Sequence, residues 1–196
     1  MIALADANNF YCSAERVFNP SLLNKPVIVL SNNDGCVISR SNEAKQLGIK
    51  MAVPLYQITP LCHKYDVKIF SSNYSLYGDM SQRIMKCLSY FSPEVDIYSI
   101  DEAFLNLEGF EYKNLPLYAR EIKETVEKWT GVPIALGIAS NKTLAKLANH
   151  IAKRIKGNGV FQLNSLVEEK VLMQQLEVNE VWGIGKQSQA KLQRSN

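Results

Sequence analysis

The order of strand-like and helix-like segments constrains the fold of this chain more than any other feature. Apolar runs and alternations predict strands at 2–7, 95–101, 102–107, 131–140 and 159–163. Apolar residues at helical spacing predict helices at 76–91, 115–129 and 142–156. With residues 8–75 set aside, the order is β-α-β-β-α-β followed by one more helix and strand, which is the ferredoxin-like pattern. We therefore expect an α/β protein of the α+β type.

This topology predicts that three acidic residues meet. A βαβ crossover makes the first two strands parallel, and the third strand lies between them and runs the other way. We expect Asp6 to end the first strand, Asp101 to end the second and Glu102 to begin the third. All three carboxylates should then lie at one edge of the sheet.

Such a cluster repels itself, and ionised carboxylates are costly to remove from water unless something pairs with them. The candidate ligands are hard oxygens with no nearby histidine or cysteine, which favours Mg²⁺ over zinc. Two ions about 4 Å apart on shared carboxylates form the arrangement that polymerases and nucleases use. The alternative is that Asp101 and Glu102 belong to a solvated hairpin turn or cap a helix, and the residues by themselves leave both possibilities open.

Composition excludes some classes of function. The net charge is only +3, so any nucleic-acid surface must be local. The four cysteines form no CxxC pair and are accompanied by two histidines, which disfavours a zinc site or a disulfide framework and favours reduced thiols. The N-terminus has no basic region, and no run of about 18 apolar residues is present, so we expect a cytoplasmic protein without a signal peptide or membrane anchor.

A basic helix is predicted after the fourth strand. Residues 140–156 contain five basic residues and no acid. On a helix, one stripe separate from the apolar one contains Lys142, Lys146, Asn149, Lys153 and Lys156. The stripe either is solvated or faces phosphate groups, and the pattern alone favours solvation.

Several long motifs resemble the Y-family, or translesion, DNA polymerases. They are "DANNFYCSAE" at 6–15, "SIDEAF" at 99–104 and "ASNKTLAKLANHIAK" at 139–153. "KPVIVLSNNDGCVISRSNEAKQLGIKM" at 25–51, "FSSNYSLYGDMSQRIM" at 70–85 and "VWGIGK" at 181–186 are similar to the UmuC branch of that family. The resemblance runs from Met1 to about Leu192.

The resemblance implies three domains and the metal ligands. A catalytic palm would comprise 1–18 and 72–164, small fingers 19–71, and a partial thumb with a helix-hairpin-helix 165–196. Asp6, Asp101 and Glu102 fall on the family's metal-binding carboxylates, and the carbonyl of Ala7 on a further ligand of the two Mg²⁺ ions. Because the family continues beyond the length of this chain, we expect the little finger and the clamp-binding segment to be absent.

The resemblance also implies a nucleotide site. Tyr11 falls on the steric gate that excludes a ribose 2′-hydroxyl, with Phe10 beside it, although this pair alone would sooner indicate core packing. Lys153 falls on the triphosphate, as do Lys45 and Asn42, with the hydroxyl of Ser39 nearby. Lys45 replaces the usual arginine and Asn42 a frequent tyrosine. A lysine lacks the bidentate fork of arginine, so we expect weak nucleotide binding.

The remaining implied contacts are with DNA. Cys36 and Ile38 would lie under the templating base, and small side chains there fit tolerance of damaged bases. Lys142 and Lys146 would meet the DNA backbone or solvent. The turn at Gly183 and Gly185, followed by Lys186, would approach a phosphate through backbone N–H groups.

The activity so implied is error-prone, template-directed DNA synthesis past lesions during SOS mutagenesis. Its partners would be primer–template DNA, deoxynucleoside triphosphates, a UmuD-type accessory subunit and RecA. The alternative is a catalytically silent remnant that binds DNA or a UmuD-type partner. A nucleotidyl cyclase is disfavoured, because the sequence has no GGDEF-like loop.

Overall fold

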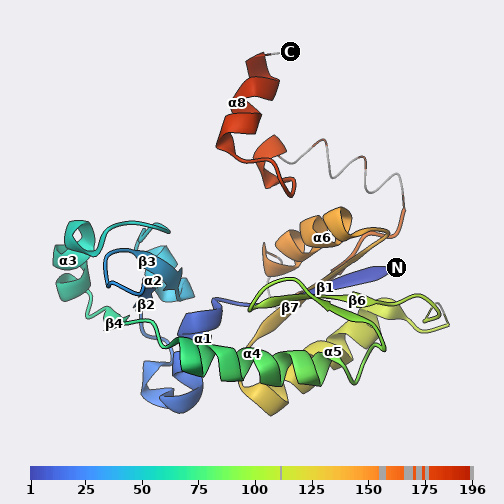
Figure 1. The fold of residues 1–196 in the computed structure, drawn as a ribbon, viewed down its shortest axis with the longest axis horizontal. Coiled ribbons are helices and arrows are strands. Elements are labelled where there is room, and N and C mark those ends of the chain that lie inside the picture. Colours follow the sequence, from blue (N-terminus) through green and yellow to red (C-terminus); the bar gives the residue numbers. More distant parts are fainter. Residues whose placement is uncertain (111, 155–157, 166–169, 171–173, 175–176, 195–196) are drawn as a thin grey trace. The chain divides into compact units, whose positions relative to one another are not determined.

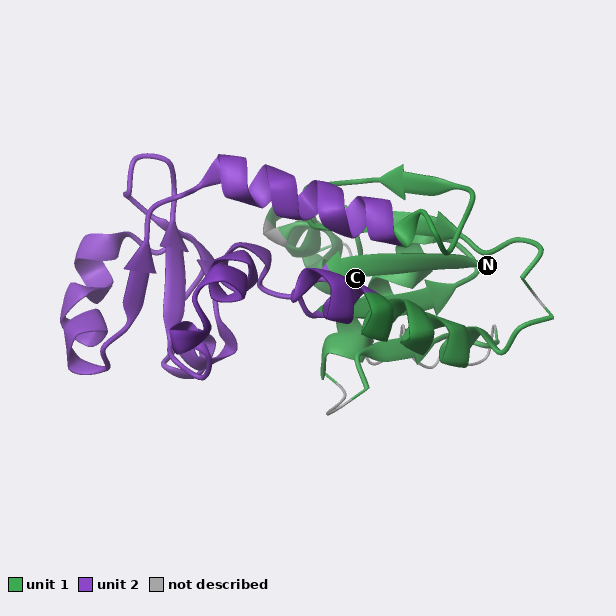
Figure 2. Ribbon diagram, turned by 90° about the horizontal axis from the view of Figure 1, so that it is seen from below, with its two compact units in different colours: residues 1–6, 88–125, 134–196 green, residues 7–87, 126–133 purple. Residues whose placement is uncertain are grey.

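The computed structural model describes residues 1–110, 112–154, 158–165, 170, 174 and 177–194 (Figure 1). The chain divides into two compact units (Figure 2). Unit 1 comprises 1–6, 88–125 and 134–196, and unit 2 comprises 7–87 and 126–133. These boundaries group 7–18 and 72–87 with the segment 19–71, so the division into palm and fingers stays a prediction.

Unit 1 is built on a five-stranded sheet in the order β5-β6-β1-β7-β8. The strands are β1 Ile2–Ala7, β5 Val95–Ile97, β6 Glu102–Asn106, β7 Ile134–Ala139 and β8 Val160–Gln162. β6 lies between β1 and β5 and is antiparallel to both. The ferredoxin-like fold predicted from the order of segments is therefore confirmed.

Helix α6, Lys142–Arg154, packs on this sheet. Leu144, Leu147 and Ala148 meet Leu4 and Phe104 in one apolar cluster. The helix approaches β7 so closely at Gly137 that an added Cβ would lie 2.0 Å from the backbone nitrogen of Asn149. Only glycine fits there. The predicted end of this helix, at residue 156, lies outside the described residues.

The basic stripe predicted on this helix is only partly correct. Asn149 is 2% exposed and does not face solvent with the lysines. Its Nδ2 donates to the carbonyls of Leu4, at 3.2 Å, and Ala135, at 2.9 Å. The asparagine therefore ties the helix to two strands, because a buried amide needs hydrogen-bond partners.

The prediction that Asp101 ends a strand is wrong. β5 ends at Ile97, and the amides of Tyr98 and Ser99 both donate to the carbonyl of Glu102, at 3.0 and 3.1 Å. The Ser99 hydroxyl also accepts from the amide of Glu102 at 3.1 Å. These local bonds compete with the ladder and turn the chain, so Asp101 lies in the connection between β5 and β6.

Two further helices follow the predicted apolar stripes. Helix α4 spans Tyr74–Leu88 and begins where the Asn73 side chain accepts from the amide of Leu76 at 3.1 Å. Helix α5 spans Leu115–Thr130 and buries Tyr118, Ala119 and Ile122. Helix α4 begins two residues before and ends three residues before the predicted bounds 76–91, because a capping side chain rather than periodicity decides where it begins. Helix α5 begins at the predicted residue and ends one residue later than predicted.

Unit 2 contains a second, three-stranded sheet in the order β3-β2-β4. β2 Val27–Leu30 is antiparallel to β3 Val37–Arg40 and parallel to β4 Lys68–Phe70. The helices α1 Phe10–Phe18, α2 Asn42–Gln46 and α3 Leu55–Lys64 and the 3₁₀ turn η1 Pro20–Leu22 belong to the same unit. Ser41 caps α2 by accepting from the amide of Ala44 at 3.3 Å, as its sequence position predicts.

The C-terminal part of the described chain holds a 3₁₀ turn, η2 Val178–Glu180, and a helix, α8 Lys186–Arg194. Gly183 between them has φ +87°, a conformation that favours glycine. Most of 166–176, which would contain the start of the predicted thumb, lies outside the described residues. Among the helices that are described, none has the length and apolar character needed to cross a bilayer.

Candidate active site

Two of the predicted carboxylates face each other across the unit 1 sheet. In the β1–β6 pair, Asp6 lies directly opposite Glu102. Their side chains are only 13% and 14% exposed. Like charges in this position destabilise a sheet, so the pair needs counter-charges.

Helix α6 supplies those counter-charges. Lys153 Nζ lies 2.5 Å from Asp6 Oδ2, and Lys146 Nζ lies 3.0 and 2.9 Å from the two oxygens of Glu102. The lysines are seven residues apart, so both project from one face of the helix. Burial raises the pKa of Asp6 to about 6, although the charge of Lys153 opposes this rise.

Asp101, the third carboxylate, is held by a serine. The Ser99 hydroxyl donates to Asp101 Oδ1 at 2.6 Å and accepts from the amide of Glu102. The sequence analysis did not identify Ser99. The pattern that could have identified it is a hydroxyl residue two positions before Asp101 and three before Glu102, from where its side chain can bond within the turn. The serine fixes the turn that presents both acids side by side.

The donor set fits Mg²⁺ in its chemistry, because all three side chains offer hard oxygens. In the described part of the chain, however, no group of three or more histidine, cysteine, aspartate or glutamate side chains is arranged to hold an ion. The ammonium groups of Lys146 and Lys153 lie on Glu102 and Asp6 instead. Binding of an ion would require these lysines to move aside.

In unit 2, Tyr11 rests on a second tyrosine. Its ring stacks on Tyr77 at a centroid distance of 4.3 Å and meets Tyr74 edge-on at 6.3 Å. Tyr77 is fully buried, and its hydroxyl donates to Glu15 at 2.8 Å. Phe10 is buried, whereas Tyr11 is partly exposed. The stack fixes the plane of the Tyr11 ring.

Three polar side chains gather beside the start of helix α1. Asn9 adopts φ +50° at the N-cap of α1. Its Oδ1 accepts from Lys45 Nζ at 2.5 Å, and its Nδ2 donates to Asn42 at 3.0 Å. The structure thus brings together Asn42 and Lys45, and it adds Asn9 to them. The only sign of the left-handed backbone of Asn9 in the sequence is that two asparagines, Asn8 and Asn9, follow each other.

The other predicted contacts are dispersed. Ser39 is buried and accepts from the amide of Cys12 at 3.4 Å, while Cys36 and Ile38 are half-buried. Ala7, whose backbone carbonyl is a predicted metal ligand, ends β1. Gly183 and Gly185 have no atom within 4 Å of an added Cβ, and Lys186 begins α8.

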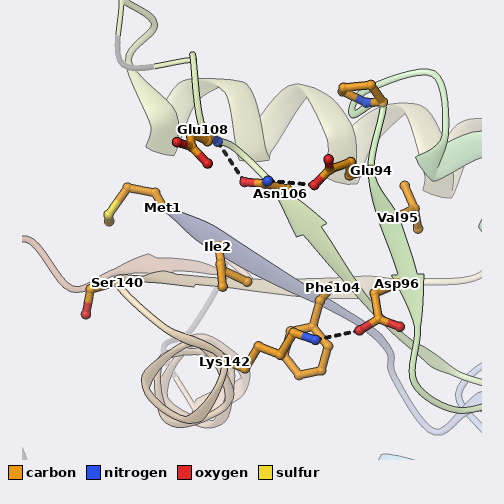
Figure 3. A pocket seen from close by; sticks show the side chains of 11 residues that line it. Met1, Ile2, Glu94, Val95, Asp96, Phe104, Asn106, Glu108, Ser140 and Lys142 are labelled. Atoms are coloured by element: carbon orange, nitrogen blue, oxygen red, sulfur yellow. Dashed lines mark hydrogen bonds and ion pairs between the residues drawn. The ribbon is translucent and has the colours of Figure 1, made fainter.

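Unit 1 has a pocket of about 600 Å³ whose lining includes none of the three predicted carboxylates. Figure 3 shows the side chains that line it. Ile2 and Phe104 contribute apolar surface, and Glu94 and Asp96 contribute charge. Lys142 reaches across it to Asp96 at 2.5 Å (Figure 3). This salt bridge is about half exposed and screened, so it contributes little to stability.

Comparison with solved structures defines the class of protein. The chain matches the insertion ternary complex of Dbh DNA polymerase with a TM-score of 0.87 and 27% identity, covering 100% of this chain and 58% of that one. It matches DinB from Sulfolobus solfataricus with a TM-score of 0.85 and 28% identity, covering 100% of this chain and 57% of that one. The fold is the palm-type α+β fold of the Y-family DNA polymerases.

Sequence comparison defines the family. The family model described as impB/mucB/samB matches residues 5–150, and the chain belongs to that family. It is 48% identical to the protein UmuC of Salmonella typhimurium over 195 residues, which is 98% of this chain and 46% of that protein. It is 33% identical to DNA polymerase IV of Oceanobacillus iheyensis over 95% of this chain and 44% of that protein. The chain thus spans about half the length of the relatives it matches.

Proposed function

We propose that this chain carries the catalytic part of a UmuC-like, error-prone DNA polymerase that acts past lesions in SOS mutagenesis. The observation that carries the proposal is the opposed pair Asp6 and Glu102, with Asp101 beside it in the turn. The relatives named UmuC and DNA polymerase IV support it. Residues 1–18 and 72–164 form the palm, 19–71 the fingers and 165–196 part of the thumb.

In this proposal Asp6, Asp101, Glu102 and the carbonyl of Ala7 hold two Mg²⁺ ions. The ions would supply the chemistry of nucleotidyl transfer by activating a primer 3′-hydroxyl and stabilising the leaving phosphate. Ser99 keeps the Asp101 carboxylate oriented. Once Lys153 has moved away from Asp6, its ammonium group stabilises the negative charge that develops on the leaving pyrophosphate.

Other residues select and hold the nucleotide and DNA. Tyr11, kept in place by Tyr77, excludes a ribose 2′-hydroxyl, with Phe10 beside it. Lys45, Asn42 and Ser39 hold the triphosphate side. The template and backbone contacts are those expected from the sequence, namely Cys36, Ile38, Lys142, Lys146, Gly183, Gly185 and Lys186. The substrates are deoxynucleoside triphosphates and primer–template DNA, and a UmuD-type subunit and RecA are partners, in the bacterial cytoplasm.

The test is single-nucleotide primer extension with Mg²⁺ at low salt and high protein concentration. The parent chain should extend the primer, and Asp101→Ala should reduce extension by at least 10³-fold while the fold stays intact by circular dichroism. Asp79→Ala, an exposed acid on α4 outside the predicted site, serves as the control and should extend like the parent. Full activity of Asp101→Ala would refute the assignment.

One observation favours a second candidate, a silent remnant that binds DNA or a UmuD-type partner. Lysines already neutralise two of the three carboxylates. In that case neither the parent nor Asp101→Ala would extend a primer, and the chain would instead inhibit an intact relative by competing for DNA.

A further inference from the structure

The Lys146 side chain is held on three sides. Its ammonium group bonds both oxygens of Glu102 and lies 4.7 Å from the ring centre of Tyr98 and 5.5 Å from that of Trp182. We call Glu102, Tyr98 and Trp182 the Lys146 cage. A cation over two aromatic faces and against a carboxylate is stabilised by charge and by the ring quadrupoles.

The cage is itself a bridge between the sheet edge and the C-terminal segment. Trp182 Nε1 donates to the Tyr98 hydroxyl at 3.2 Å, and the two rings meet edge-on at 5.2 Å and 89°. Trp182 also lies 6.0 Å from Phe104. Within unit 1, these contacts attach the segment 178–194 to the residues around Glu102.

Comparison with Lys142 shows that the Lys146 cage differs from an ordinary salt bridge on the surface. One turn earlier on the same helix, it bonds Asp96 and lies 5.2 Å from the ring of Phe104 (Figure 3). Lys142 thus also pairs with a carboxylate over a ring, but Asp96 is 61% exposed whereas Glu102 is 14% exposed. Of these two lysines, Lys146 is the one that neutralises a largely buried acid of the predicted metal site.

We propose that the ammonium group of Lys146 occupies the position of a divalent ion at Glu102 while no ion is bound. We propose further that displacement of Lys146 by the ion weakens the contacts that hold Trp182. The inference rests on the proposed metal site. The ammonium group lies 3.0 and 2.9 Å from the two oxygens of Glu102, so a divalent ion on the same oxygens is repelled by it at close range, and in our proposal binding of the ion drives Lys146 from the cage. Trp182 then loses its cation partner, and the state of the metal site is transmitted to the segment 178–194.

The test uses Trp182 as a reporter. The chain has two tryptophans, so Trp129→Phe leaves Trp182 as the sole one. In this background, Mg²⁺ should change Trp182 emission with the same midpoint as Mg²⁺ binding measured by calorimetry without DNA. Lys146→Met should change the metal-free emission, abolish the response to Mg²⁺ and tighten Mg²⁺ binding about fivefold, because the competing cation is gone.

Lys142→Met is the matched control and should respond to Mg²⁺ as the background does. Metal-free emission that is unaltered by Lys146→Met would refute the cage itself. Calorimetric Mg²⁺ binding without any change in Trp182 emission would refute the coupling while leaving the metal site intact. Absence of Mg²⁺ binding in every variant would refute the proposed metal site, and the coupling with it.

Discussion

At the scale of single residues, the structure shows which positions in the candidate site a sequence can predict. The positions of Asp6 and Glu102 were predictable because Asp6 lies one residue before the end of β1 and Glu102 begins β6, and the topology sets those ends side by side. Ser99, Asn9 and Trp182 were not, because their roles depend on individual hydrogen bonds and ring contacts that leave no periodic signal. The turn at 98–101 was missed for the same reason.

Tyr11 gives a prediction at this scale. Tyr11→Ala should lower the preference for deoxynucleotides over ribonucleotides by on the order of tenfold or more, since it removes the ring proposed to meet the 2′-position. Tyr74→Ala is the control, because Tyr74 touches Tyr11 edge-on but is half exposed. The measurement is the ratio of incorporation of the two substrates. An unchanged ratio in Tyr11→Ala would rule out the steric-gate role.

The cysteines give a second prediction, which depends on pH. Cys12 is 1% exposed, and burial raises the pKa of its thiol to about 11, whereas Cys36 is half-buried. At pH 8 an alkylating reagent should modify Cys36 first and spare Cys12, as mass spectrometry of peptides can show. Because the folded thiol releases its proton at higher pH than the unfolded thiol does, it lowers stability as pH rises from 9 towards 11.

The predicted loss of stability with rising pH can be tested with Cys12→Ala. Between pH 8.5 and 10.5 the parent should lose about 1–2 kcal/mol more of its free energy of unfolding than the variant loses, as urea titrations can measure. Parallel curves for the two proteins would mean that Cys12 ionises equally easily in both states.

At the scale of elements, periodicity predicted almost every described strand and helix of unit 1, and it was less accurate at some of their ends. Strands 2–7 and 102–107 appear as β1 and β6, whereas the strand expected to reach 101 stops at Ile97. The stripe on α6 was correct for its lysines and wrong for Asn149, because a polar residue can be buried when strand carbonyls accept its bonds.

The close approach of α6 to β7 gives a prediction for these elements. Gly137→Ala should destabilise the protein by about 3 kcal/mol or more, because its Cβ would lie 2.0 Å from one backbone atom of the helix and 2.4 Å from another. Gly185→Ala should cost far less, since nothing lies within 4 Å of its added Cβ. Thermal unfolding of the two variants measures the difference, and equal melting temperatures would contradict it.

At the scale of the whole molecule, the fold class followed from the order of segments. The division into palm, fingers and thumb stays a prediction, because the two compact units are defined by contacts between distant segments and do not test it. The chain also spans 46% of its UmuC relative, so much of that protein's surface lies outside it.

The net charge of +3 gives a prediction for DNA binding by the whole chain. Binding should be weak, with a Kd of about 10⁻⁴ to 10⁻⁶ M near physiological salt, and should weaken as salt rises. Lys142→Met should reduce the salt slope by about one unit if that lysine contacts a phosphate. Lys68→Met should not, because Lys68, which like Lys142 pairs with an aspartate, lies outside the predicted DNA contacts. Fluorescence anisotropy at several salt concentrations measures both slopes.

The pairing of Asp6 with Lys153 has a consequence for the synthesis of the protein on the ribosome. The two residues are 147 positions apart, so at about 5–20 residues per second a ribosome takes about 7–30 s to make the second after the first. During that interval the nascent strand carries an acid without its counter-charge. The ion pair therefore cannot form before Lys153 has been made, and the acid at the edge of the sheet gains its counter-charge only together with the helix that covers the sheet.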